Sequence, residues 1–320
     1  MWAAVEHSIS NVIVLVIIAS LGYWVARRGI ADAAGRKLVS RLVNLSIPFF
    51  LFYSVTSKFT HDQLIELLKM GFLPFLVVAL NFLASQAMIR LGWVRRELAG
   101  AFTACFTGST VLFVGVPMAM ALFGEAGIPY LLVYFFANCV FIWTVGLYNI
   151  QLDGVRRVGG ERPALISARS LRMLLSLPLV SFLAGLAFVL FSLPVPDFLS
   201  GATKLCGQMT TPLAIVFIGM TIEKVGFERM KHLPREIWLV LLGCFVIRPV
   251  LMYVCTLPFD MEPLMQKVFV VASALPVSSV IAVLAKQYGA DEEYTSEAIG
   301  ASTIALIAWL PVILIAVTLI

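Results

Sequence analysis

The chain has 320 residues, of which 61% are hydrophobic and 13% are charged, and its mean hydropathy is +0.98. So few polar residues cannot cover the surface of a soluble domain, and the composition therefore excludes a soluble globular protein. The formal net charge of +5 does not indicate nucleic-acid binding, because the lysines and arginines are scattered between apolar segments.

Apolar segments long enough to cross about 30 Å of hydrocarbon recur along the whole chain. We expect transmembrane helices at residues 9–27, 38–57, 70–90, 98–123, 128–150, 173–193, 198–222, 236–257, 267–287 and 298–319. The second of these is interrupted by polar residues and by Pro48. The sequence thus predicts an all-α polytopic membrane protein with about ten transmembrane helices.

Basic residues gather in the loops on one side of this arrangement, which hold 17 of the 23 lysines and arginines. The positive-inside rule makes that side cytoplasmic and puts both termini outside. Arg27 and Arg28 follow the first apolar segment and no basic residue precedes it, which is the reverse of a cleavable signal peptide. We expect a multi-pass protein of the inner (plasma) membrane that keeps its first helix.

The longest polar connection, residues 151–172, leaves five predicted spans on either side. We expect a first five-helix repeat at 1–150, a cytoplasmic linker at 151–172 and a second five-helix repeat at 173–320, all in a single membrane domain. Because five is an odd number, the two repeats must be inverted with respect to the membrane.

Matching residues in the second and seventh spans support this repeat. Three pairs coincide on alignment: Pro48 with Pro212, Asn44 with Gln208 and Ser46 with Thr210. We expect Asn44 and Gln208 to be a polar pair of the scaffold. A second pair of prolines, Pro117 and Pro276, is separated by 159 residues, whereas Pro48 and Pro212 are separated by 164. Aligning both pairs therefore requires a gap in the alignment of the two repeats.

Pro117 and Pro276 predict helix interruptions in the fourth and ninth spans, although a simple kink is the alternative for each. Interrupted helices at equivalent places of two repeats indicate a substrate site near the membrane midplane. The N-terminal ends of half-helices are electropositive and favour an anion. Hydroxyl donors beside the prolines could assist, or could simply serve helix packing. The candidate substrate-binding residues are Ser109, Thr110, Gly115, Pro117, Pro276, Ser278, Ser279 and Arg248.

Arg248 lies near the middle of the eighth predicted span and is followed by Pro249. It could attract an anion inside the bundle, or it could snorkel or cap carbonyls that Pro249 frees. Both interpretations remain open at this point.

Other chemistry lacks the residues it needs. No Asp or Glu lies deep in a predicted span, which argues against a proton antiporter built on a buried carboxylate pair. His7, His61 and His232 lie at span ends or in loops, so neither a metal site nor a Ser-His protease can be assembled. We expect no enzyme, no catalytic residue, no metal and no cofactor. The expected partners are a small organic anion, membrane lipid and a second copy of the chain in a homodimer, and not nucleic acid.

Three motifs resemble those of the auxin efflux carrier family, whose bacterial members include malonate-type transporters. They are Gly115-Val-Pro117-Met-Ala-Met-Ala-Leu-Phe-Gly124, Thr211-Pro212-Leu-Ala-Ile-Val-Phe-Ile-Gly219-Met and the segment from Pro276 to Gly289. The resemblance implies two inverted repeats in which broken helices 4 and 9 cross at Pro117 and Pro276, an architecture similar to that of bile-acid symporters and sodium–proton antiporters. It also implies a scaffold of spans 1, 2, 6 and 7 and a transport domain of spans 3–5 and 8–10.

The sequence departs from the family where substrate contacts are expected, since Thr110 and Val280 stand where asparagine is common and Leu112 where glycine is common. The function that the resemblance implies is secondary transport of small organic anions, such as malonate-like dicarboxylates or auxin-like acids, by an elevator-type movement. Two alternatives stay open. One is a sodium- or proton-coupled symporter of the bile-acid type, and the other is a membrane receptor that binds a ligand without cycling.

Overall fold

The computed structural model describes residues 2–59, 67, 69–165, 175–225 and 233–319. These residues are predominantly helical, and the described ranges contain no β-strand beyond one isolated bridge between Ser109 and Val277. The predicted all-α class is therefore confirmed. The predicted linker 151–172 falls partly outside the described residues, and its first part continues helix α8 to Val158.

Two compact units make up the chain, and each is assembled from three separate segments. Unit 1 contains residues 1–71, 112–133 and 175–224, and unit 2 contains residues 72–111, 134–174 and 225–320. The chain therefore passes from one unit to the other several times. One of these passages lies within the fourth predicted span, at residues 111 and 112.

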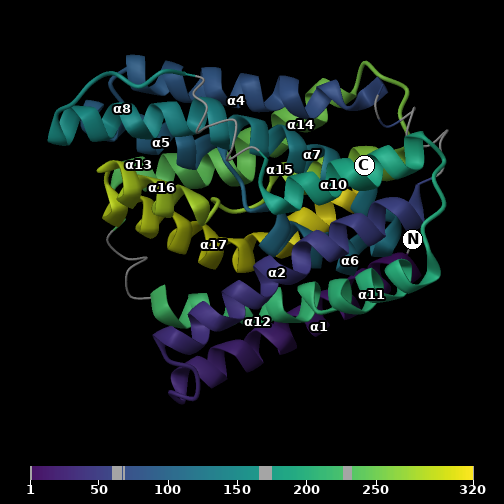
Figure 1. Cartoon of the computed structure of the whole chain (residues 1–320). Coiled ribbons are helices and arrows are strands. Elements are labelled where there is room, and N and C mark those ends of the chain that lie inside the picture. Colours follow the sequence, from purple (N-terminus) through teal and green to yellow (C-terminus); the bar gives the residue numbers. More distant parts are fainter. Residues whose placement is uncertain (1, 60–66, 68, 166–174, 226–232, 320) are drawn as a thin grey trace. The chain divides into compact units, whose positions relative to one another are not determined.

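The helices of unit 1 are α1 (Trp2–Arg27), α2 (Ala33–Lys58), α6 (Val116–Phe123), the 3-10 turn η3 (Gly124–Gly127), α10 (Leu177–Leu190), α11 (Asp197–Gln208) and α12 (Thr210–Val225). Helix α2 packs against both α10 and α11, and α1 packs against α6 (Figure 1). A π-helical turn, η2 (Val111–Gly115), and helix α7 (Ile128–Phe141) each have residues in both units.

Local sequence explains how α2 starts and how α12 meets α1. The side chain of Asp32 accepts a hydrogen bond from Gly35 N at 2.8 Å and caps the N-terminus of α2. Helix α2 then runs through Pro48 without ending. Gly219 of α12 lies so close to α1 that a Cβ atom there would be 1.9 Å from the carbonyl oxygen of Ala19. The missing side chain thus lets the two backbones touch.

The helices of unit 2 are α4 (Phe72–Arg90), η1 (Arg96–Leu98), α5 (Ala99–Thr107), the π-helical turn η4 (Ile142–Gly146), α8 (Leu147–Val158), α13 (Arg235–Leu242), the π-helical turn η6 (Gly243–Ile247), α14 (Arg248–Thr256), α15 (Pro263–Ser273), α16 (Val280–Tyr288) and α17 (Glu292–Leu319). Helix α5 contacts α4, α8, α13, α16 and α17, which makes it the central element of this unit (Figure 1).

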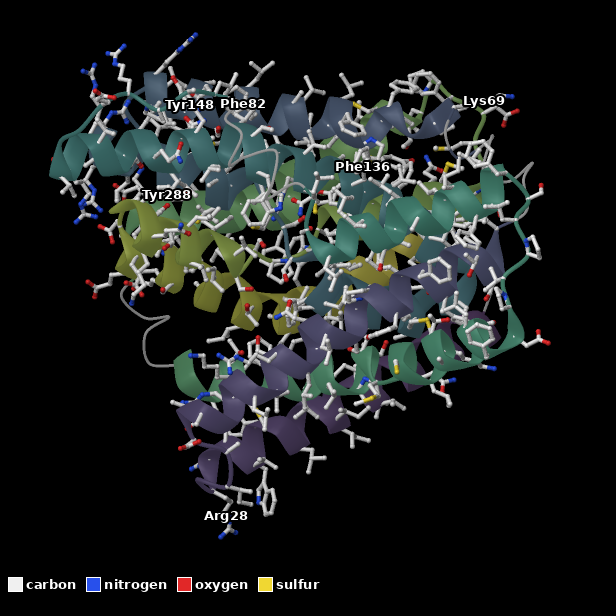
Figure 2. All side chains as sticks on the ribbon, viewed as in Figure 1. Arg28, Lys69, Phe82, Phe136, Tyr148 and Tyr288 are labelled. Carbon is white, nitrogen blue, oxygen red and sulfur yellow. The ribbon has the colours of Figure 1, made fainter. Side chains whose placement is uncertain are left out.

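Aromatic side chains fill the spaces between helices of unit 2. The rings of Phe82 and Phe141 have centroids 6.5 Å apart, and those of Phe75 and Phe136 meet edge to face at 5.6 Å. Figure 2 labels one ring of each pair, Phe82 and Phe136. Such pairs contribute about 0.5–1.5 kcal/mol beyond their burial in water-soluble proteins.

By length and composition, six helical runs among the described residues could cross a membrane: Ala33–Ser57, Phe72–Arg90, Val111–Val158, Asp197–Glu223, Arg235–Thr256 and Glu292–Ile313. Two shorter apolar helices, Ile13–Arg27 and Leu177–Leu190, accompany them. These helices are those of a multi-pass membrane protein. The count of ten spans and the inverted repeats stay predictions.

Candidate functional site

Two helices of unit 2 stop in its interior and resume after a short extended segment. Helix α5 ends at Thr107, and residues Gly108–Thr110 separate it from the π-helical turn η2. Helix α15 ends at Ser273, and α16 begins only at Val280. The fourth and ninth predicted spans are therefore both interrupted, and Pro276 lies within the second interruption.

Pro117 is not where the fourth span breaks, which corrects the crossing point that the resemblance implied. It lies in the first turn of α6, directly after the π-helical turn η2. A proline in the first turn costs little, because no intrahelical donor is lost there. The preceding π-turn carries the helix into α6, so the chain stays helical at Pro117. The break instead occurs at Gly108–Thr110, a segment without proline.

The two extended segments pair with each other. Ser109 and Val277 form an antiparallel bridge, and Thr110 N donates to the carbonyl oxygen of Pro276 at 2.9 Å. This pairing satisfies backbone groups that the interrupted helices leave without intrahelical partners. The structure thereby brings together three of the predicted site residues, Ser109, Thr110 and Pro276.

Two further side chains hold these segments, and the sequence did not single them out. The Asn138 amide of α7 accepts from Ser109 N at 2.9 Å and donates to Ser109 O at 2.8 Å. The Ser302 hydroxyl of α17 accepts from Val277 N at 3.1 Å. An asparagine inside the apolar run Tyr-Phe-Phe-Ala-Asn-Cys-Val-Phe was the available signal for Asn138, because a buried amide needs partners.

Hydroxyl groups at the paired segments remain available to a ligand. The side chains of Thr110 and Ser278 are buried, and their hydroxyls have no hydrogen-bond partner among the described residues. Ser279 is exposed and stands at the N-cap of α16, whose N-terminus receives no side-chain capping bond. Ser278 and Ser279 thus place two hydroxyl-bearing residues directly before α16, at the positive end of its dipole.

Arg248 is fully buried at the start of α14, and its partners are main-chain oxygens. Its two terminal nitrogens donate to Thr107 O at 3.3 Å and to Leu275 O at 2.7 Å. Thr107 is the last residue of α5, and Leu275 lies in the extended segment just after α15. The guanidinium thus caps carbonyls, as one of the two predicted interpretations had it, but the carbonyls belong to the interrupted helices and not to the helix of Pro249.

The remaining predicted residues lie in unit 1 and do not form a cluster. Gly115 ends the π-turn η2, and Pro117 follows it. Asn44 and Gln208 are not hydrogen-bonded to each other: the Asn44 amide donates to Ser40 O, and the exposed Gln208 has no hydrogen-bond partner among the described residues.

The aligned hydroxyl residues of α2 and α12 do meet in unit 1. Thr210 Oγ1 donates to Ser46 Oγ at 2.8 Å, and both side chains are buried. The repeat alignment had matched these two residues. Residues that the alignment makes equivalent are therefore in direct contact.

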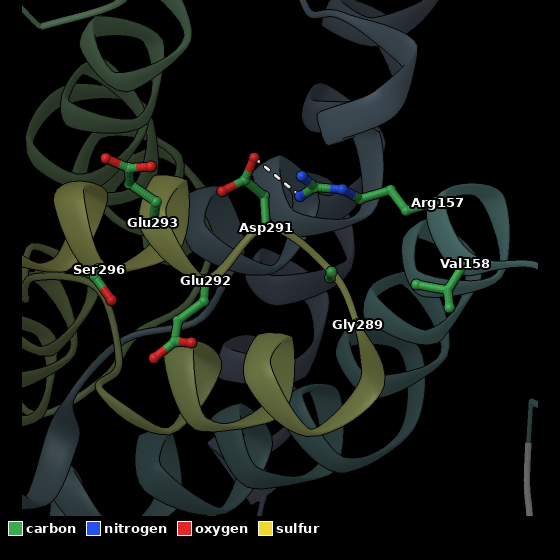
Figure 3. A pocket seen from close by; sticks show the side chains of 8 residues that line it. Arg157, Val158, Gly289, Asp291, Glu292, Glu293 and Ser296 are labelled. Carbon is green, nitrogen blue, oxygen red and sulfur yellow. Dashed lines mark ion pairs between the residues drawn. The ribbon is translucent and has the colours of Figure 1, made fainter.

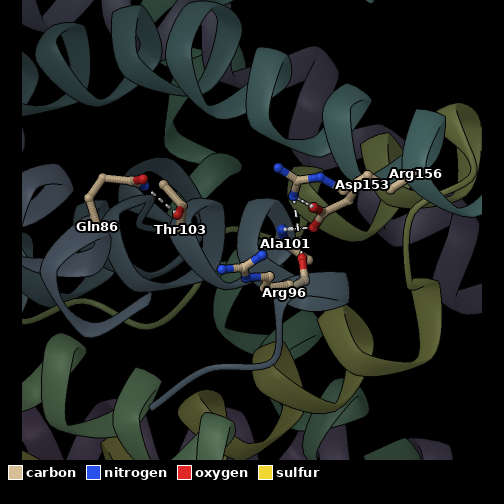
Figure 4. A network of polar contacts seen from close by, with 6 residues as sticks. All are labelled: Gln86, Arg96, Ala101, Thr103, Asp153 and Arg156. Atoms are coloured by element: carbon tan, nitrogen blue, oxygen red, sulfur yellow. Dashed lines mark hydrogen bonds and ion pairs between the residues drawn. The ribbon is translucent and has the colours of Figure 1, made fainter. Parts of the chain in front are cut away.

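Unit 2 also contains a buried carboxylate near the end of α8, outside the predicted span 128–150. Asp153 of α8 has no exposed surface. Figure 4 shows it accepting from Ala101 N at 2.7 Å and pairing with Arg156 at 2.9 Å. Its charge therefore stabilises the N-terminal end of α5. The sequence did not predict the burial of Asp153, because this residue lies in the polar stretch 151–172 that was expected to be a linker.

A second carboxylate, that of Glu236, is largely buried and pairs with Arg95 at 2.7 Å. The hydrogen bond to this carboxylate raises the pKa of Arg95. Both buried carboxylates are thus neutralised by arginines.

An open cavity of about 650 Å³ lies where α8 ends and α17 begins. Figure 3 shows Arg157 reaching Asp291 across it, with an ion-pair distance of 3.0 Å. Glu292 and Glu293 also line the cavity. Since Arg157 and Asp291 are partly exposed and the pair lies at helix ends, we assign it to the surface of the unit. In the described part of the chain, no group of three or more His, Cys, Asp and Glu residues could hold a metal ion.

Comparison with known proteins gives relatives along nearly the full length of the chain. A protein of Rhizobium meliloti named "Putative malonate transporter" is 26% identical over 300 residues, which cover 90% of this chain and 89% of that protein. An uncharacterized transporter of Methanocaldococcus jannaschii is 22% identical over 318 residues, covering 93% of this chain and 97% of that protein.

The model of a family described as "Membrane transport protein" matches residues 7–314. This match covers the motifs in the fourth, seventh and ninth spans and both interrupted helices. The chain therefore belongs to the membrane transport protein family, the auxin efflux carrier family whose motifs its sequence resembles.

Proposed function

We propose that this protein is a secondary transporter of small organic anions that works by alternating access. The observation that carries the proposal is the meeting of two interrupted helices in unit 2, where hydroxyls without partners stand at the start of α16. Transporters built on repeats place substrate sites at such discontinuous helices, with half-helix N-termini directed at anionic groups. Carboxylates suit this environment because they accept hydrogen bonds from N–H and O–H donors.

The lengths of the half-helices support a site at the midplane. Helices α5 and α16 have nine residues each, so each extends about 14 Å at 1.5 Å per residue. A hydrocarbon core is about 30 Å thick. A helix of this length that starts at one face therefore ends near the middle, where a substrate has to be handed from one side to the other.

Contacts within the units support an inverted repeat. The ends of α5 and α15 are 166 residues apart (107 to 273), close to the 164 residues that separate Ser46 from Thr210. The offset of 159 residues obtained from Pro117 is no longer needed. We propose that spans 1, 2, 6 and 7 form the scaffold and that unit 2, which contains both breaks, carries the substrate in an elevator-type movement.

The dicarboxylate class is supported by the relative whose name includes malonate. Malonate is small and carries two carboxylates, and the paired segments offer donors from two sides. We therefore propose malonate-like dicarboxylates as the first substrates to test, and aromatic acids as the second.

We also propose that both termini face the outside of the inner (plasma) membrane. The loop at Asp291 is acidic, and its own charge does not favour the cytoplasmic side. Asp291 nevertheless pairs with Arg157. Arg157 belongs to the basic loops that the positive-inside rule makes cytoplasmic. A single cysteine at Gly160, in a background without the five native cysteines, should resist an impermeant thiol reagent in intact cells.

Counterflow in proteoliposomes tests the transport proposal. Vesicles loaded with unlabelled malonate should take up labelled malonate, whereas a receptor that does not cycle would give no exchange. With no sodium or proton gradient, an inside-positive potential should increase net uptake, because each elementary charge moved through 100 mV is worth about 2.3 kcal/mol. Uptake that required an ion gradient and ignored voltage would favour the coupled symporter.

A further inference from the structure

The C-terminal ends of α5 and α15 share one cation, the guanidinium of Arg248. Both ends present carbonyl oxygens that have no intrahelical donor, and both carry the negative end of a helix dipole. Arg248 donates to one oxygen from each end, at 3.3 Å to Thr107 O and at 2.7 Å to Leu275 O. One side chain therefore links the two interrupted helices.

No carboxylate of the described residues forms an ion pair with Arg248, although its side chain has no exposed surface. A buried charge without a counterion is costly and is retained only where dipoles or hydrogen bonds compensate it. Here the two helix ends supply that compensation. Pairing with a carboxylate is thus not what keeps this arginine in the core of unit 2.

Two buried hydroxyls belong to residues next to this guanidinium. The hydroxyl of Tyr134 lies close to Arg248 but not at hydrogen-bonding geometry, and the hydroxyl of Thr107, whose carbonyl accepts from Arg248, has no hydrogen-bond partner. The Arg248 Nε atom is likewise without an acceptor. Two carbonyls and the hydroxyl of Tyr134 are therefore close to one positive charge.

That set of oxygens has the chemistry of an alkali-cation site. Carbonyls at half-helix C-terminal ends and in unwound segments coordinate Na⁺ in transporters that couple substrate movement to an ion. Here two such carbonyls already accept from a cation that is covalently part of the chain and cannot dissociate. A free cation would have to displace the guanidinium and would meet its charge.

We propose that Arg248 is a resident cation that takes the place of a coupling Na⁺ at the interrupted helices, so that the transport cycle proceeds without sodium. Arg248 is then a positioning residue: it holds α5 and α15 together so that the N-terminal side of the break can receive the anion. This inference rests on the proposed transport function for its kinetic consequence only.

Removing the side chain should turn the site into one that needs an added cation. In Arg248→Ala the two carbonyls and the Tyr134 hydroxyl remain, and the space of the guanidinium is empty. We expect malonate counterflow in choline medium to fall at least about tenfold, because both charge-assisted hydrogen bonds that link the two interrupted helices are lost. Millimolar guanidinium, far below denaturing concentrations, or Na⁺ should restore a large part of the rate.

Four proteins give the comparison. The wild type should exchange malonate equally in choline and in sodium media, and Arg248→Lys should keep more activity than Arg248→Ala because it retains a cation. Arg36→Ala is the matched control, since Arg36 pairs with Glu223 at 3.7 Å at a partly exposed position of unit 1. This variant should show no response to added guanidinium.

Thermal unfolding in detergent, with the same three cations, separates this inference from the transport proposal. Arg248→Ala should melt below the wild type in choline and be stabilised by guanidinium, even if malonate proves not to be transported. Stabilisation of the wild type by Na⁺, or sodium-dependent exchange by it, would overturn the inference. So would an Arg248→Ala protein that folds, loses activity and responds to neither cation.

Discussion

Helix α2 of unit 1 and the pair α5 and α15 of unit 2 show that a proline does not decide where a membrane helix breaks. Helix α2 contains Pro48 in its middle and continues from Ala33 to Lys58. Helix α5 ends at Thr107 with no proline in the following segment. What distinguishes the break is the set of partners that receive the freed backbone groups.

In unit 2 those partners are specific and come from distant segments. Asn138, Ser302 and Arg248 each bind backbone groups of an extended segment or helix end. In unit 1 the contact between α2 and α12 joins two side chains, Ser46 and Thr210, and leaves the backbone of α2 helical. Unpaired backbone groups are too costly in lipid for a break without such partners.

The largest effect is expected from Asn138→Ala. It leaves the buried N–H and C=O of Ser109 without their amide partner, and each unsatisfied group costs about 1–3 kcal/mol. We expect a loss of about 3 kcal/mol in the free energy of unfolding, together with loss of malonate counterflow.

Asn149→Ala is the matched control for Asn138→Ala, because the Asn149 amide donates only to Val145 O of the preceding turn. It should change stability by less than about 1 kcal/mol. Equal unfolding midpoints for the two variants would show that the hydrogen bonds between Asn138 and the backbone of Ser109 do not stabilise the break in unit 2.

Close helix packing should matter equally in both units. An added Cβ at Gly100 would lie 1.9 Å from Asn149 O, and at Gly219 it would lie 1.9 Å from Ala19 O. The helices must move apart, so Gly100→Ala and Gly219→Ala should each cost about 1–3 kcal/mol, despite the better helix propensity of alanine. Gly201→Ala, where nothing lies within 4 Å, should be neutral or slightly stabilising. A neutral Gly219→Ala would contradict the contact of α1 with α12.

A smaller effect is expected from the hydroxyl pair of unit 1. Ser46→Ala or Thr210→Val should cost about 1 kcal/mol, the usual worth of a neutral hydrogen bond. The double variant should cost little more than either single one, because both remove the same interaction. Additive losses in chemical denaturation would show that the two hydroxyls act separately.

The smallest effect is expected at Pro117. Pro117→Ala changes a first-turn position in a chain that is already helical, so stability should shift by no more than about 0.5 kcal/mol and counterflow should persist. Pro276→Ala is the contrasting variant, because it adds a buried N–H to the extended segment and should cost about 1–3 kcal/mol. If a folded Pro117→Ala protein lost counterflow, Pro117 would be needed for the functional interruption of the fourth span.

The sequence by itself determined the class and the family of this protein. Lipid is the solvent for most of the chain, and it requires apolar segments long enough to cross the hydrocarbon core. This requirement shows directly in the composition and in the recurrence of such segments. The motifs around Pro117, Pro212 and Pro276 identified the family, and the break near Pro276 followed from local chemistry.

Only the tertiary structure decided which residues build the site. Asn138 binds Ser109 across 29 residues, and Arg248 reaches carbonyls that lie 141 and 27 residues away. Each is a polar side chain in an apolar run, but the local sequence does not tell which distant backbone groups it binds. The burial of Asp153 likewise depends on α5 packing against α8, which its local sequence does not show. Hydrogen bonds between distant segments depend on which helices meet, and that is settled by packing of the whole unit.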